Sequence, residues 1–197
     1  MYEAEFPLDD SITYLNHAAV SPWPQRTANA VKRFADENTA FGSQNYLHWV
    51  ATESTLKQQL QRLVNAESSD EIALLKNTSE ALSVVAYGLP WQQGDCVVIT
   101  DQEFPSNRVV WESLKKHGVT TRIATVSGSE SPEAAIIETL DDSTRILSVS
   151  AVQFGTGLKL DLAVLGKACR ERGILFCIDA IQGIGAMDFD VQASHAD

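Results

Sequence analysis

The stretch Cys96-Val97-Val98-Ile99-Thr100 predicts a buried strand, because apolar and β-branched residues follow one another in it without alternation. A polar loop leads from it into Arg108 to His117, an amphipathic segment that predicts a helix with Gly118 as the residue after its end. A strand that is apolar on both faces and is followed by a helix is typical of a parallel sheet covered by helices. The expected fold class is therefore α/β, with a mostly parallel sheet flanked by helices.

The same alternation continues on both sides of this strand. Further strands are predicted at residues 71–76, 122–126, 145–152 and 174–178, and further helices at 78–88, 131–140 and 161–173. Ser131 and Pro132 suit the start of one of these helices, and Asp161 is expected to cap another. Alternating strands and helices indicate βαβ units, and such sheets bind ligands beyond the carboxyl ends of their strands.

The first part of the chain follows a different pattern. It is irregular up to Trp23, after which Pro24 opens a helical segment and a second helix is expected from Tyr46 to Val64. We therefore expect residues 1–70 to form an N-terminal irregular segment with helices, and residues 71–197 to form an α/β domain.

Composition excludes several classes of partner. The chain has 197 residues and a formal net charge of -11, without a run rich in Lys or Arg, which disfavours nucleic acid and anionic membranes as partners. Its N-terminus is acidic and has no apolar signal core, and no apolar run reaches the ~18 residues of a membrane span, so we expect a cytoplasmic protein. The three cysteines and four histidines have no metal-ligand spacing, and we expect no metal site.

Two predicted strand ends carry residues suited to an anion and to a flat ring. In Asn77-Thr78-Ser79-Glu80 a helix begins, and its free N–H groups and two hydroxyls suit a phosphate, although an ordinary helix cap explains the same residues. Phe104 lies in the loop after the strand 96–100, where it can stack on a flat ring or simply cover the core. Pro105 restricts Phe104 to an extended backbone.

Two later strand ends add a glycine turn and an acid. Gly155 and Gly157 allow a close backbone approach, or only a turn. Asp179 directly follows a buried strand, where a carboxylate is costly unless it is paired, and a protonated pyridine nitrogen is a suitable partner. Gln182 can then reach a substituent of the same ring, although Asp179 can equally bond a turn.

Together these residues resemble the class V aminotransferase superfamily, whose members use pyridoxal 5′-phosphate (PLP) and include cysteine desulfurases and isopenicillin N epimerase-like proteins. The resemblance rests on Tyr14 to Ala19, Asn77 to Ala81, Glu103 to Asn107 and Asp179 to Gln182, in this order along nearly the whole chain. It implies the large domain of a fold type I PLP enzyme, an amino-acid substrate and a homodimer.

The resemblance also implies roles for individual residues. By this resemblance, Thr78 and Ser79 would bind the phosphate of PLP. Asp179 would bond the ring nitrogen, Gln182 the 3′ oxygen, and Phe104 would stack on the ring. The substrate side would be lined by His17, Ala18 and Ala19. Phe104 occupies the position of a histidine in cysteine desulfurases, and Val152 that of an asparagine. Because phenylalanine cannot transfer protons, we expect another branch of the family.

The lysine that forms the Schiff base in this family follows the Asp-x-x-Gln motif, and no such lysine follows Asp179 in this sequence. We therefore expect an N-terminal part of a longer enzyme, without the small C-terminal domain and inactive alone. Two alternatives stay open. One is a non-catalytic module that binds PLP or a phosphate, and the other is a dinucleotide-binding α/β domain, against which the absence of a third glycine after Gly183 and Gly185 counts.

Overall fold

A computed structural model describes residues 2–197 and divides them into two compact units, which meet at Leu56 and Lys57 within one helix. The first unit holds an irregular segment, helix α1 (Gln25–Phe41) and the start of helix α2 (Tyr46–Val64). Pro24 directly precedes α1, as expected. The two helices bury no residue, and their contacts include an edge-to-face pair of Phe34 and Trp49 with ring centroids 5.3 Å apart.

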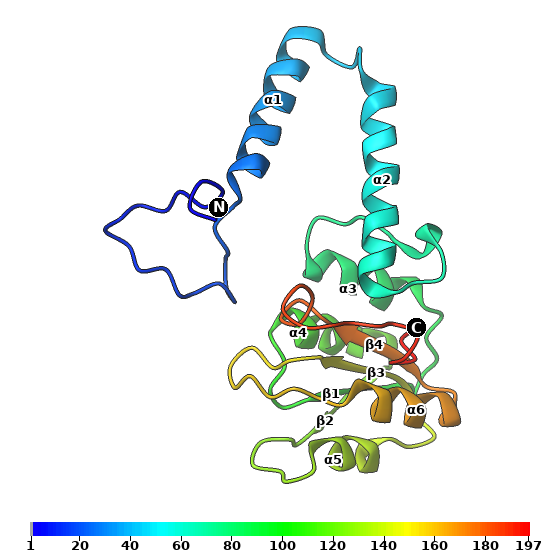
Figure 1. The fold of residues 1–197 in the computed structure, drawn as a ribbon. Helices are drawn as coiled ribbons and strands as arrows, with labels where there is room; N and C mark the ends of the chain where they lie inside the picture. The colour runs from blue at the N-terminus through cyan, green and yellow to red at the C-terminus, as the bar shows by residue number, and fades with distance from the viewer. Residues whose placement is uncertain (1) are drawn as a thin grey trace. The chain divides into compact units, whose positions relative to one another are not determined.

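The second unit is built on a four-stranded, wholly parallel sheet of strand order β2-β1-β3-β4 (Figure 1). Its elements in chain order are the end of α2, a 3₁₀ turn (Ser69–Glu71), α3 (Thr78–Gly88), β1 (Cys96–Thr100), α4 (Ser106–Glu112), a second 3₁₀ turn (Ser113–His117), β2 (Thr120–Ala124), α5 (Pro132–Thr139), β3 (Thr144–Ser150), α6 (Leu162–Arg172) and β4 (Leu175–Asp179). The predicted α/β class with a mostly parallel sheet is confirmed.

Helices cover both faces of this sheet. On one face α5 and α6 pack through Ile136 and Leu165 against Val98 and Leu147, which lie on the two central strands. On the other face α3 and α4 pack through Leu82 and Trp111 against the opposite-facing residues of the same strands. All five residues of β1 are buried, as expected for a central strand with helices on both sides.

The structure shifts the bounds of the predicted strands by one or two residues, so that β2 begins at Thr120 and β3 ends at Ser150, and it differs more at three other places. Residues 71–76 form no strand, because the apolar Leu74 and Leu75 are 41% and 44% exposed and pair with no neighbouring strand. The helix predicted from Arg108 begins earlier and tightens into the 3₁₀ turn before Gly118, whose φ of 78° confirms its place after the helix end. Ser131 precedes α5 but its side chain does not cap it, while Asp161 caps α6 through the N–H of Val164 as predicted.

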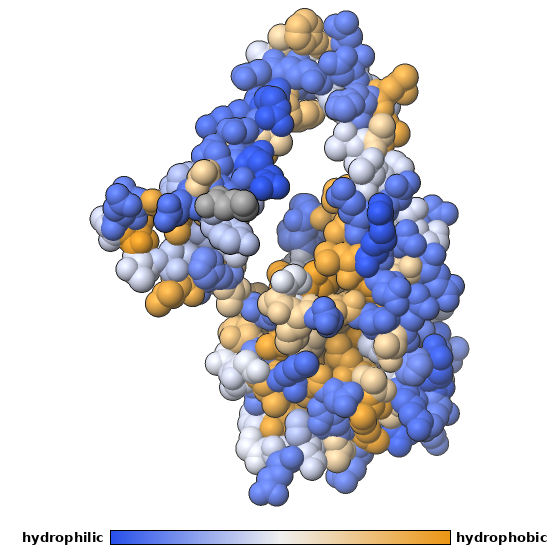
Figure 2. Space-filling view, viewed as in Figure 1, coloured by the Kyte–Doolittle hydropathy of each residue, from blue (hydrophilic) through white to orange (hydrophobic). Residues whose placement is uncertain are grey.

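Apolar side chains also reach the surface of the second unit (Figure 2). Val84, Val85 and Tyr87 of α3 are 55%, 39% and 50% exposed. Exposed apolar patches of this kind are typical of surfaces that contact other protein. None of the helices in residues 2–197 has the length and apolar content needed to cross a bilayer.

Candidate functional site

The carboxyl ends of β1, β3 and β4 bring together residues from three of the predicted site segments. Phe104 follows β1, Gln153 follows β3, and Asp179 is the last residue of β4. Ser150, the last residue of β3, is the register partner of Asp179 on the neighbouring strand. The edge of the sheet at which ligands are expected is therefore the edge that carries these side chains.

Asp179 is a buried acid, 7% exposed, at this edge. Its side chain accepts a hydrogen bond from the backbone N–H of Ile181 at 3.2 Å, and no Lys, Arg or His of residues 2–197 lies within ion-pair distance of it. Burial raises the pKa of Asp179 above its usual range, while the Ile181 bond acts in the opposite direction. A cationic group brought against this carboxylate would be strongly stabilised.

Helix α3 begins at the predicted place and is capped from both directions. The side chain of Asn77 accepts from the N–H of Glu80 at 2.9 Å, and the Glu80 carboxylate accepts from the N–H of Lys76 at 2.8 Å. The N–H groups of Thr78 and Ser79 belong to the first turn and have no acceptor within the helix. They leave a positive helix end that suits an anion.

The two loops that follow β1 and β3 form an aromatic pair. Phe104 is 47% exposed and meets Phe154 edge to face, with ring centroids 5.1 Å apart. The loops are joined by a hydrogen bond of 2.5 Å from the hydroxyl of Thr156 to the side chain of Gln102. In the turn after β3, Gly157 adopts a φ of 71°, a backbone conformation that favours glycine, which explains this glycine but not Gly155.

Two polar residues of this site escaped the sequence prediction. Glu103 is 8% exposed and Gln153 is 1% exposed, and the Gln153 amide donates to the Glu103 carboxylate at 2.9 Å. The Oε1 atom of Gln153 is buried without a hydrogen-bond partner in the described part of the chain. Each lies three positions beyond a buried strand, and a polar residue at that place is the signal in the sequence that indicates them.

The residues predicted to line the substrate side lie in the other compact unit. His17, Ala18 and Ala19 are exposed there, and His17 meets Tyr14 edge to face at 5.2 Å. Their role stays a prediction. Gln182, half-buried in the turn after Asp179, likewise keeps its predicted role as a prediction.

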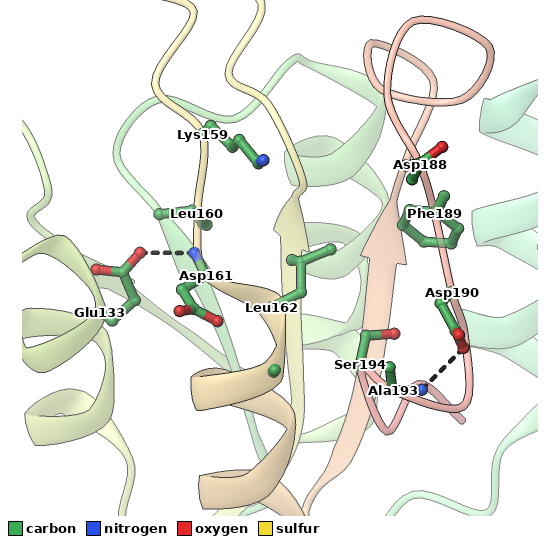
Figure 3. A pocket seen from close by; sticks show the side chains of 11 residues that line it. Glu133, Lys159, Leu160, Asp161, Leu162, Asp188, Phe189, Asp190, Ala193 and Ser194 are labelled. Carbon is green, nitrogen blue, oxygen red and sulfur yellow. Dashed lines mark hydrogen bonds between the residues drawn. The ribbon is translucent and has the colours of Figure 1, made fainter.

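A hollow beside α6 is lined by four acids, one lysine and several apolar residues (Figure 3). Glu133 accepts from the backbone N–H of Asp161 at 2.7 Å, and Asp190 accepts from the N–H of Ala193 at 2.9 Å. Because its four carboxylates outnumber the single cation, Lys159, this hollow is a poor anion site compared with the start of α3. Among residues 2–197, no three His, Cys, Asp or Glu side chains are grouped to hold a metal ion.

Solved structures share this fold. C-DES, described in one solved structure as a cystine C-S lyase, matches in a mutant structure that is described as having glycine covalently linked to the PLP cofactor. The TM-score is 0.89 over 99% of this chain and 53% of that chain, at 24% identity. The cysteine desulfurase CsdA from Escherichia coli matches with a TM-score of 0.86 over 100% of this chain and 52% of its own, at 23% identity.

Relatives by sequence include a protein of Methanothermobacter thermautotrophicus named "Probable cysteine desulfurase", which is 32% identical over 98% of this chain and 49% of its own length. An uncharacterized protein of Schizosaccharomyces pombe is 29% identical over 91% of this chain and 41% of its own. The chain thus spans about half the length of the curated relatives it matches. The family model for class V aminotransferases matches residues 13–197, and the chain belongs to this family.

Proposed function

We propose that the full-length protein is a PLP-dependent enzyme that acts on an amino acid, with its cofactor at the carboxyl edge of this sheet. The observation that carries the proposal is Asp179, a buried carboxylate without a cationic partner among the described residues. A protonated pyridine nitrogen supplies that missing partner. When bound, PLP provides the electron sink for breaking bonds at the α-carbon of an amino acid.

The surrounding residues fit the other parts of the cofactor. The first turn of α3 would take the phosphate, because the N–H groups of Thr78 and Ser79 have no acceptor within the helix and the helix end is positive. Phe104 is exposed enough to stack on the ring, and Gln182 would hold the 3′ oxygen. His17, Ala18 and Ala19 would line the substrate side, and the exposure of all three residues supports this role.

We further propose that the protein acts as a cytoplasmic homodimer, supported by the apolar surface of α3 and by the lack of a spanning helix in residues 2–197.

The Schiff-base lysine would come from the part of the relatives' length that this chain does not span. Lys159 and Lys167, the two lysines nearest before Asp179 in the sequence, are exposed, and Lys167 pairs with Glu171 at 4.0 Å.

Replacement of Asp179 by Ala tests the proposal. In the full-length protein we expect kcat to fall on the order of 100-fold, the scale for removing one electrostatic stabiliser, because the ring nitrogen loses its partner. The measurement is turnover of a panel of amino acids with saturating PLP, and Asp142→Ala, at an exposed site, serves as the control. Near-normal turnover in a folded Asp179→Ala protein would refute the assignment.

The reaction is either desulfuration of cysteine or another PLP-dependent reaction of an amino acid. The names of several relatives favour desulfuration of cysteine. Phe104 favours another reaction, because a phenyl ring stacks on the cofactor but transfers no proton. We therefore expect the full-length enzyme to release little sulfide from cysteine, measured with methylene blue, and Phe104→His to leave PLP bound. Rapid sulfide release by the unmodified enzyme would make desulfuration the function.

A further inference from the structure

A second buried acid lies beside Asp179, and the reaction proposed above leaves it without a role. The Glu103 carboxylate accepts from the hydroxyl of Thr100 at 2.7 Å, the amide of Asn107 at 2.8 Å and the hydroxyl of Ser150 at 2.6 Å. It also accepts from the backbone N–H of Ser150 at 3.0 Å and from the Gln153 amide at 2.9 Å. One carboxylate thus joins the ends of β1 and β3 to the start of α4.

The hydrogen bonds around Glu103 are those of an ionised group. Both of its oxygens lie against groups that can only donate, namely the Ser150 N–H and the amide nitrogens of Asn107 and Gln153, and a carboxylate is the form that accepts on both oxygens. Within residues 2–197 no Lys, Arg or His lies at ion-pair distance from it. Its charge is therefore held by dipoles alone and acts on its surroundings without a local countercharge.

The charge of Glu103 acts on the end of β4. Ser150, whose backbone N–H and hydroxyl both donate to Glu103, is the register partner of Asp179. The N–H of Ala151 donates to the Asp179 carbonyl at 2.9 Å. Beyond the larger effect of burial, the charge of Glu103 also raises the pKa of Asp179. The same charge contributes to raising the pKa of the neighbouring Cys177 thiol to about 11, for which burial is the main cause.

We propose that Glu103 is a positioning residue that acts through Asp179, and that its buried charge keeps the proton on the cofactor nitrogen that Asp179 faces. The proposal rests on the proposed function for the identity of that cation. One negative charge at Asp179 attracts the protonated ring, and a second one, bonded to Ser150 at the end of the neighbouring strand β3, strengthens the attraction without touching the cofactor. Glu103 also fixes Gln153, and with it the turn that carries Phe154.

Glu103→Gln removes the charge while keeping the shape. Gln153 can rotate its amide and turn its unpartnered Oε1 toward the new side-chain N–H₂, so the network keeps a partner for the introduced donor. Glu138→Gln makes the same change at an exposed position of α5 and is the matched control. Ser150→Ala removes one donor and keeps the charge, which separates packing from electrostatics.

The test is ¹⁵N NMR of ring-labelled PLP in the full-length protein between pH 6 and 9. In Glu103→Gln we expect the ring nitrogen to lose its proton about one unit lower in pH than in the parent, the size of effect of one nearby charge. We expect kcat to fall about tenfold with KM little changed. In Glu138→Gln the ring nitrogen should lose its proton at the same pH as in the parent. Ser150→Ala should change that pH by much less than Glu103→Gln does.

The proposal would be overturned if the ring nitrogen lost its proton at the same pH in a folded Glu103→Gln protein as in the parent. An effect of Ser150→Ala as large as that of Glu103→Gln would also overturn it. If PLP does not bind, the proposed function is refuted, and the role of Glu103 is then tested in the cofactor-free protein. There, ¹³C NMR should show Asp179 ionising at lower pH in Glu103→Gln than in the parent, and equal titrations would overturn the proposal. If Glu103→Gln does not fold, the ¹³C shift of Glu103 in the unmodified protein decides, and a protonated side chain at pH 7 would refute its charge.

Discussion

Asp179 has an environment that suits a bound cation better than it suits the cofactor-free protein. Its carboxylate is buried, accepts from the backbone N–H of Ile181 and lies near a second acid, Glu103. Burial raises the pKa of Asp179, so the folded protein holds this proton more tightly than the unfolded chain does. The stability that Asp179 contributes is therefore greatest at low pH and falls as pH rises through the elevated value.

We expect Asp179→Asn to stabilise the cofactor-free, full-length protein at pH 7, by on the order of 1 kcal/mol, because it removes a buried charge while an amide oxygen still accepts from Ile181. Near pH 3, where Asp179 is protonated in both folded and unfolded states, parent and variant should unfold at the same denaturant concentration. Urea unfolding at the two pH values is the measurement. A variant that is less stable at pH 7 would show that Asp179 has a cationic partner in the cofactor-free protein.

At the scale of elements, helix α6 is fixed by a close approach at Gly166. A Cβ atom at this position would collide with the backbone carbonyl of Ser194, in the segment that follows β4 and returns beside α6. The N–H of Ser194 donates to the carbonyl of Asp190 at 3.0 Å, so that segment is itself held in a turn. The small residue in α6 therefore allows the return of the chain from the carboxyl edge.

Gly166→Ala should destabilise the protein by about 2 kcal/mol, because backbone and helix must move apart to admit the methyl group. Gly88→Ala is the matched control, since Gly88 ends α3 and a Cβ there meets nothing within 4 Å. We expect the control to be neutral or slightly stabilising, as Ala favours a helix over Gly. Equal unfolding midpoints for the two variants in urea would contradict the close packing of α6.

At the scale of the whole molecule, the sequence predicts the α/β domain well and the candidate site only partly. The limits of α3 and β1 follow from strong local features, a capping pair at Asn77 and Glu80 and an unbroken apolar run. Residues 72–75 are also an unbroken apolar run but pair with no strand. Whether an apolar run finds a neighbouring strand depends on residues far away in the sequence, which no local pattern contains.

The site shows the same limit. Asp179 was predictable because an acid directly after a buried strand is costly and needs a reason. Glu103 and Gln153 were not, because their hydrogen bond joins residues 50 positions apart, and only the parallel pairing of β1 and β3 brings them together. The polar network beneath the site therefore depends on the sheet, while the residues expected to face the cofactor depend on local sequence.

The central claim is that the carboxyl edge of this sheet holds PLP, with its ring nitrogen on Asp179 and its phosphate on the first turn of α3. A crystal structure of the full-length protein with PLP tests this most directly. We expect the ring nitrogen within about 3 Å of the Asp179 carboxylate and a phosphate oxygen at hydrogen-bond distance from the N–H groups of Thr78 or Ser79. A phosphate bound away from α3, or a ring nitrogen facing away from Asp179, would contradict the claim.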